Sequence, residues 1–189
     1  MEIIKNEHDF STSVERALDE IDLKWRDYPG VLVLGTHVPL DLGLKMINIE
    51  RARMNGIPFL GICFGMQLAA IEFARNALKM PKATSEELGP GDHVITKLPR
   101  LHVGLDKVAG WWGTTDESHW HNYSFNMKYK NEFLKHFDIS ESDGIAEIMR
   151  LKNHRFFVGV QFHPEYNSFK DKPHPVLKDF IDVCRTIAA

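Results

Sequence analysis

The chain has 189 residues, a formal net charge of −3 at pH 7 and 43% hydrophobic residues. This length and composition predict a single folded domain over residues 1–189 and exclude a disordered chain. The weak negative charge gives no electrostatic reason to expect nucleic acid or an anionic membrane as a partner. We see no run of about 20 apolar residues and no N-terminal targeting pattern, so we expect a soluble protein of the cytoplasm. Two cysteines, Cys63 and Cys184, do not make a disulfide framework.

Apolar runs alternate with helical patterns in the first half of the chain. The spacing of apolar residues predicts a helix over residues 11–21, capped by Ser11 or Thr12. The other predicted elements are strands at 1–5, 31–34 and 57–62 and helices at 42–54 and 65–78. This alternation predicts an α/β fold, a three-layer sandwich with a mostly parallel central sheet and helices on both faces. Functional groups should then gather at the carboxyl ends of the strands.

The second half has weaker signals. Residues 80–120 are rich in glycine, proline and charge, and we expect lid and pocket walls there, with short strands around 93–95 and 101–103. Residues 146–151 and 155–162 are typical of a hairpin. A closing helix is predicted over 176–187.

The segment Gly61-Ile62-Cys63-Phe64-Gly65 is a Gly-x-Cys-x-Gly turn between a predicted strand and a predicted helix. This strand–turn–helix context presents a nucleophile at a sharp elbow. The positive end of the following helix favours the thiolate, which is the reactive form of cysteine. Cys63 is therefore the candidate nucleophile.

His163 and Glu165 follow the apolar run 156–160. Two residues apart in an extended chain, their side chains point the same way. Such a pair supplies a general base and a carboxylate that orients it. Together with Cys63 they predict a Cys-His-Glu catalytic triad.

The two segments 61–67 and 161–166 resemble the catalytic core of the class I glutamine amidotransferases, and within that family the amidotransferase domain of CTP synthases. Three further stretches fit the same domain: 71–76, 143–144 and 173–175. The resemblance covers most of the chain and implies the flavodoxin-like fold of this family. It also implies that Cys63, His163 and Glu165 hydrolyse the side-chain amide of glutamine through a cysteinyl thioester, with no cofactor.

Amide hydrolysis also needs hydrogen-bond donors for the tetrahedral oxyanion. The N–H of Phe64 is the first expected donor. The family takes a second donor from a Gly-Gly-x-Gly loop, where this chain has Gly35-Thr36-His37-Val38-Pro39. Thr36 and His37 do not readily adopt the positive φ that glycine allows. We therefore expect an altered oxyanion site made by Phe64, Gly35 and Thr36, with His37 either part of this loop or a surface residue.

Substrate recognition departs from the family as well. The family's His-Arg-Tyr-Glu segment, whose arginine contacts the glutamine carboxylate, aligns with His121-Asn122-Tyr123-Ser124. Asn122 cannot form a bidentate ion pair. Glu86 and Gln67 match family residues that hold glutamine. The expected substrate-binding residues are thus Gln67, Glu86, Asn122 and Tyr123, and the substrate carboxylate is recognised differently.

Other residues have plainer alternatives. Cys184 has core spacing in the closing helix, so we expect it to pack rather than react. His119-x-His121 beside Asp116 and Glu117 resembles a set of metal ligands, but no further His or Cys stands at a recognised spacing, so we expect no metal. Four aromatic residues either line a pocket or cover the core: Trp111, Trp112, Trp120 and Tyr123.

Three functions stay open at this point. The first is an amide hydrolase acting alone on glutamine or a related small molecule. The second is a glutaminase subunit that docks on a separate synthetase and delivers ammonia to it. The third is a non-catalytic regulatory or binding module. The sequence has no phosphate-binding loop and no second domain, so we expect that it does not itself activate UTP. A homodimer is also compatible with the sequence.

Overall fold

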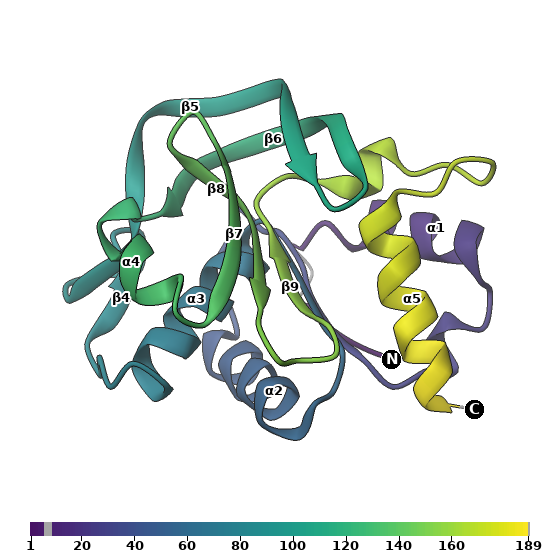
Figure 1. Ribbon diagram of the computed structural model, residues 1–189, viewed down its shortest axis with the longest axis horizontal. Helices are drawn as coiled ribbons and strands as arrows, with labels where there is room; N and C mark the ends of the chain where they lie inside the picture. Colours follow the sequence, from purple (N-terminus) through teal and green to yellow (C-terminus); the bar gives the residue numbers. More distant parts are fainter. Residues whose placement is uncertain (6–8, 189) are drawn as a thin grey trace.

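The computed structural model describes residues 1–5 and 9–188, and its central element is a six-stranded sheet (Figure 1). The strand order is β1-β2-β3-β9-β8-β7. The first four strands in this order are parallel, whereas β8 and β7 are each antiparallel to their neighbour. The strands span Glu2–Ile4 (β1), Val31–Val33 (β2), Phe59–Ile62 (β3), Phe137–Ser142 (β7), Ile145–Leu151 (β8) and Phe157–Val160 (β9).

Helices cover both faces of this sheet because successive side chains of a strand point to opposite faces. Val31 and Val33 pack with apolar residues of α2 and α3, whereas Leu32 and Leu34 pack with those of α1 and α5. The helices span Ser11–Ile21 (α1), Leu42–Asn55 (α2), Phe64–Asn76 (α3), Lys130–Phe133 (α4) and Pro175–Ala188 (α5). The three-layer α/β sandwich predicted from the alternation of elements is therefore confirmed.

A second sheet lies over the end of the first. It contains β4 (Ala83–Ser85), β5 (Asp92–Gly110) and β6 (Gly113–Phe125), and the last two form a long antiparallel ribbon. Figure 1 shows this ribbon crossing above the central strands. The N–H of His163 donates to the carbonyl of Ser118 at 2.8 Å, which ties the end of β9 to β6. The ribbon is thus fixed against the part of the sheet that carries the predicted catalytic residues.

The structure corrects three expectations about local structure. The two short strands predicted around 93–95 and 101–103 belong to one strand, β5, which pairs with β6 on both sides of an irregularity between Lys97 and His102. The sequence did not predict strands β4, β6 and β7; β6 is mostly polar and owes its conformation to its partner strand. Helix α1 begins at Ser11 itself, without a side-chain cap. Among the described residues, no helix is both long and apolar enough to cross a membrane.

Candidate active site

Cys63 occupies a strained turn between β3 and α3. Its backbone has φ 52° and ψ −103°, a conformation that costs a residue with a side chain about 1–3 kcal/mol. Two backbone hydrogen bonds hold it there. The Cys63 N–H donates to Val160 of the neighbouring strand at 2.7 Å, and the Cys63 carbonyl accepts from the N–H of Gln67 at 3.2 Å. One bond to the sheet and one bond to helix α3 therefore hold Cys63 in this strained conformation.

The glycines beside Cys63 are required by close backbone packing. A Cβ atom on Gly65 would lie 2.1 Å from the carbonyl oxygen of Val33, and one on Gly61 would lie 2.6 Å from the carbonyl carbon of Gly65. Real Cβ atoms do not come this near to backbone atoms. The Gly-x-Cys-x-Gly pattern thus lets helix α3 start directly against strands β2 and β3, with Cys63 at the junction.

His163 and Glu165 form a buried pair at the end of β9. Nδ1 of His163 lies 2.8 Å from Oε1 of Glu165, and both side chains are at most 2% exposed. Burial lowers the pKa of His163, but interactions with Cys63 and Glu165 outweigh burial and hold that pKa well above its usual range. Nε2 of His163 has no hydrogen-bond partner among the described residues. Glu165 therefore engages Nδ1, and Nε2 is the ring nitrogen without a bond of this kind.

A helix on the opposite face holds this pair in place. Arg16 of α1 donates from Nη2 to the backbone carbonyl of Glu165 at 3.0 Å. Pro164–Asn167 forms a single 3₁₀ turn that begins directly after His163. The turn and the arginine fix the direction of the carboxylate, and the carboxylate fixes the imidazole.

Two glutamine side chains connect the nucleophile to the ribbon. The amide nitrogen of Gln161 donates to Sγ of Cys63 at 3.6 Å. The amide nitrogen of Gln67 contacts the Gln161 amide oxygen at 3.3 Å and donates to the backbone carbonyl of Tyr123 at 2.9 Å. Gln161 belongs to the segment 161–166, and its pattern alone assigns it no role, although its place two residues before the candidate base is a signal that could have identified it.

The loop after β2 closes the other side of the nucleophile. A Cβ atom on Gly35 would lie 3.0 Å from Cε1 of His163 and 3.3 Å from Cβ of Cys63. The loop needs no left-handed residue, because neither Thr36 nor His37 has a positive φ. The concern that these two side chains could not fit the loop is thus removed. His37 is exposed and stands at the rim, with its ring 4.9 Å from that of Phe10.

A cavity of about 230 Å³ adjoins Cys63. Its walls come from the loop after β2, from helix α3 and from strand β6, and the lining residues are Thr36, His37, Cys63, Phe64, Gln67, Glu87, Trp120, His121, Asn122 and Tyr123. A larger hollow of about 860 Å³ lies along α1, and Cys63 and His163 do not line it. The small cavity therefore brings together the predicted nucleophile, two of the three predicted oxyanion residues (Phe64 and Thr36) and three of the four predicted substrate-binding residues.

The fourth predicted substrate-binding residue, Glu86, does not line the cavity. Its carboxylate accepts hydrogen bonds from the Oγ1 of Thr96 and the N–H of Lys97, so it holds the end of β4 to β5. The next residue, Glu87, lines the cavity instead, and desolvation raises the pKa of its carboxyl. The structure thus places Glu87, and not Glu86, at the cavity, and the substrate-binding role of either residue stays a prediction.

The aromatic residues separate into two groups. Trp120 and Tyr123 line the cavity. Trp112 instead lies beside the buried His174, at 5.2 Å between ring centroids, and Trp111 donates to Asp179 of α5 at 2.7 Å. Two of the four aromatic residues therefore line the pocket, and the other two hold the turn between β5 and β6 against α5 and the residue before it.

Cys184 is fully buried in α5, as expected from its spacing. Burial raises the pKa of its thiol to about 12. A protonated and inaccessible thiol does not react, so Cys184 is not a candidate nucleophile.

The sequence matches the family model described as glutamine amidotransferase class-I over residues 2–183. The chain belongs to the class I glutamine amidotransferases. This amidotransferase is 37% identical over 199 residues to the CTP synthase of Sulfolobus acidocaldarius, a match that covers 92% of the chain and 37% of the relative. It is 36% identical over 201 residues to the CTP synthase of Pelagibacter ubique, covering 89% of the chain and 37% of that relative. The chain thus spans 37% of the length of these two relatives.

The fold of this amidotransferase is also that of a solved structure, the glutaminase domain of Trypanosoma brucei CTPS with bound acivicin. The two superpose with a TM-score of 0.86, covering 97% of this chain and 92% of the other, at 23% sequence identity. At this identity the likeness concerns the fold. The resemblance inferred from the motifs is confirmed by the family match and by the curated relatives.

Proposed function

We propose that this amidotransferase hydrolyses the side-chain amide of glutamine, or of a glutamine-like substrate, through a thioester on Cys63. The observation that carries the proposal is one constellation: a strained cysteine at a helix start, a buried His163–Glu165 pair beside it, and a cavity next to both. A core cysteine with only a packing role needs neither the strained backbone nor the buried ion pair.

Each half of the reaction moves one proton through His163. The thiol proton of Cys63 passes to His163 as Sγ attacks the amide carbonyl carbon, and His163 gives this proton to the amide nitrogen so that the C–N bond breaks and ammonia leaves. A water then gives a proton to His163 and attacks the thioester, and the C–S bond breaks as His163 returns the proton to Sγ, releasing the carboxylic acid. The carboxylate of Glu165 keeps Nε2 directed at the reacting atoms by holding Nδ1.

The oxyanion of each tetrahedral intermediate needs donors near Cys63. The N–H of Phe64 is the first of helix α3 and has no partner inside that helix. Gly35 and Thr36 supply the facing side of the site in this proposal, since Gly35 lies against both Cys63 and His163. One such donor is worth about 3–4 kcal/mol in related reactions.

Substrate selection rests on the polar residues of the cavity. In this proposal Glu87 and Gln67 contact the amino end of the substrate, Glu87 replacing the Glu86 of the sequence-based expectation. Asn122 stands where relatives use arginine, and it offers hydrogen bonds without a positive charge. We therefore expect weaker binding of a free α-carboxylate than in a glutaminase that has the arginine.

Ammonia release from glutamine and from a panel of other γ-glutamyl amides tests this function, with Cys63→Ala as the blank. Turnover that disappears in Cys63→Ala supports the proposal. Asn122→Arg should lower the KM for glutamine, because it restores an ion pair. Acivicin, which the trypanosome domain binds, should also label Cys63. If a folded sample shows neither ammonia release nor labelling of Cys63, the non-catalytic module is the favoured function.

A second candidate function is delivery of ammonia to a separate synthetase. It is favoured by the curated relatives, which are CTP synthases of which this chain spans 37%. This candidate predicts labelling of Cys63 by acivicin but little ammonia release from the isolated chain. Adding a synthetase domain that lacks its own glutaminase should then raise the rate. A rate independent of any partner would refute it.

A further inference from the structure

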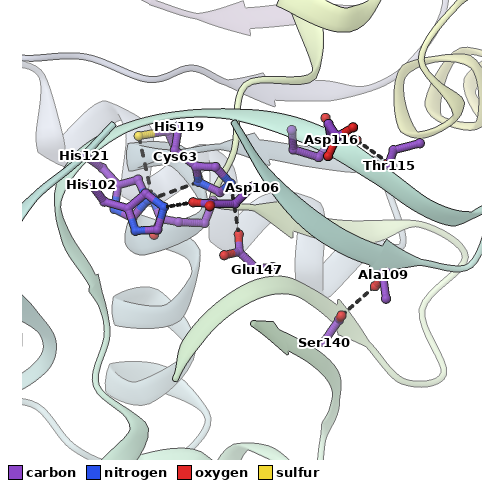
Figure 2. A network of polar contacts seen from close by, with 12 residues as sticks. Cys63, His102, Asp106, Ala109, Thr115, Asp116, His119, His121, Ser140 and Glu147 are labelled. Carbon is purple, nitrogen blue, oxygen red and sulfur yellow. Dashed lines mark hydrogen bonds and ion pairs between the residues drawn. The ribbon is translucent and has the colours of Figure 1, made fainter. Parts of the chain in front are cut away.

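Three histidines outside the triad converge between the ribbon and the central sheet. His102 of β5 pairs with His121 of β6, and His119 lies two residues before His121 on the same face of β6. One ring nitrogen from each lies within 4.8 Å of the others. Figure 2 shows the three rings gathered together, with Asp106 and Glu147 beside them. We propose that this cluster, the His102–His119–His121 site, binds a divalent transition metal ion such as Zn²⁺.

The spacing of two of the nitrogens fits a tetrahedral ion. Nδ1 of His119 and Nε2 of His121 are 3.4 Å apart. Two histidine nitrogens bound to zinc at about 2.0–2.1 Å with a tetrahedral angle lie about 3.3–3.4 Å apart. These two ligands therefore already have the required separation. His102, whose side chain is 20% exposed, is the one that must turn to complete the set.

The second nitrogen of each ring faces an acceptor, as in metal-binding histidines generally. Nδ1 of His121 lies 2.9 Å from the carbonyl oxygen of Tyr123, which can only accept, so Nε2 of that ring carries no proton when the ring is neutral. Nε2 of His102 is hydrogen-bonded to the carboxylate of Asp106. Nε2 of His119 points at Oε2 of Glu147 at 3.9 Å. His102 and His121 thus each have one nitrogen held by an acceptor, and Nε2 of His119 faces Glu147 without reaching hydrogen-bond distance.

Glu147 is otherwise hard to explain. Its side chain is 1% exposed, and neither its Oε2 nor Nε2 of His119 has a hydrogen-bond partner among the described residues. Such a pair of buried, unpaired polar atoms is costly. A cation bound to His119 would make Nε2–H a stronger donor towards Glu147 and would balance the charge of Asp106.

The site has its own route to solvent. His102 and Asp106 line a hollow of about 740 Å³ that shares no lining residue with the cavity of Cys63. His121 lines the cavity of Cys63. A bound ion would therefore stabilise the wall of the active-site cavity without entering through it. The sequence did not reveal this cluster, because His102 reaches the other two histidines only through strand pairing.

Metal titration of the full chain tests the proposal, with metal-stripped protein and Zn²⁺ or Co²⁺ as probes. One ion should bind per chain, and Co²⁺ should give the visible absorption of a four-coordinate site with no thiolate charge-transfer band. Cys63→Ala should bind as the wild type does, and so should the control His37→Ala, which alters an exposed histidine at the same cavity. His102→Ala should lose at least tenfold in affinity.

Glu147→Gln keeps the shape of the side chain and should weaken binding by about 10- to 100-fold, as expected for a group that orients a ligand. Glu147→Gln also tests the site if the direct ligand variant His119→Ala does not fold. Zn²⁺ should raise the melting temperature of Cys63→Ala but not that of His102→Ala. No binding by the wild type at 1 mM metal would overturn the proposal. Binding that Cys63→Ala abolishes and His102→Ala retains would also overturn it, because the ion would then sit on the thiol.

Discussion

Replacing Gly35 by alanine should damage catalysis while leaving the fold intact. The added Cβ would lie 3.0 Å from Cε1 of His163 and 3.3 Å from Cβ of Cys63. Ordinary carbon–carbon contacts are about 3.5–4.0 Å, so the imidazole must move by about 0.5–1 Å. The backbone of Gly35 itself has no positive φ, so the alanine adds crowding and no torsional strain.

The size of the effect follows from this displacement. A misplacement of about 1 Å in an active site costs about 100-fold in rate. We therefore expect kcat/KM to fall by about 10- to 100-fold, which is about 1.4–2.7 kcal/mol of transition-state stabilisation. The loss should appear in kcat, because Gly35 does not line the cavity that holds the substrate.

The assay is steady-state ammonia release, with alkylation of Cys63 by iodoacetamide as a second measure that needs no substrate. Gly43→Ala is the matched control, since nothing lies within 4 Å of the added Cβ in helix α2. It should retain wild-type kinetics. If Gly35→Ala is as active as Gly43→Ala and both melt as the wild type does, the inferred contact between the loop and the triad is wrong.

Three other predictions concern buried groups. Iodoacetamide should modify Cys63 and leave Cys184 unmodified in the folded chain, because burial raises the pKa of Cys184 to about 12; peptide mass spectrometry reads out both sites. Lys45→Met should lower the free energy of unfolding by about 3–5 kcal/mol, because it removes the cation 2.9 Å from the fully buried carboxylate of Asp9. Denaturant titration measures this loss, and Lys45→Met combined with Asp9→Leu should recover much of it; a single variant as stable as the wild type would contradict the buried pair. The raised pKa of His163 should keep it protonated at pH 6.5, where an ordinary histidine is half protonated. Cys63→Ala removes one cause of this rise, so the midpoint of the His163 titration followed by NMR should move to lower pH. An unchanged midpoint would count against the interaction between Cys63 and His163.

The sequence was sufficient to predict the elements that carry the triad. The elbow around Cys63 combines an apolar strand, two glycines and a helix, and each of these signals is local. The strand before His163 is likewise a continuous apolar run, as buried parallel strands are. Local patterns of this kind survive folding because the tertiary structure agrees with them.

The parts that the sequence did not reveal depend on pairing between distant residues. Strand β6 is polar along most of its length and is recognisable only beside β5. The exchange of Glu86 for Glu87 is a shift of one residue, and such a shift moves a side chain from the cavity to the ribbon. His102 joins His119 and His121 across the same ladder. Register between strands is set in three dimensions, so no linear spacing predicted these three outcomes.

The link between the triad and the ribbon runs through main-chain atoms of the pocket wall. Gln67 and His121 both bond to the backbone carbonyl of Tyr123, not to its side chain. Side chains at positions 122 and 123 can therefore be exchanged while the anchoring of the nucleophile persists. A change of the Asn122 side chain therefore leaves these bonds in place. Trp120, Asn122 and Tyr123 line the cavity and are the positions at which substrate choice can be redesigned while the elbow stays unchanged.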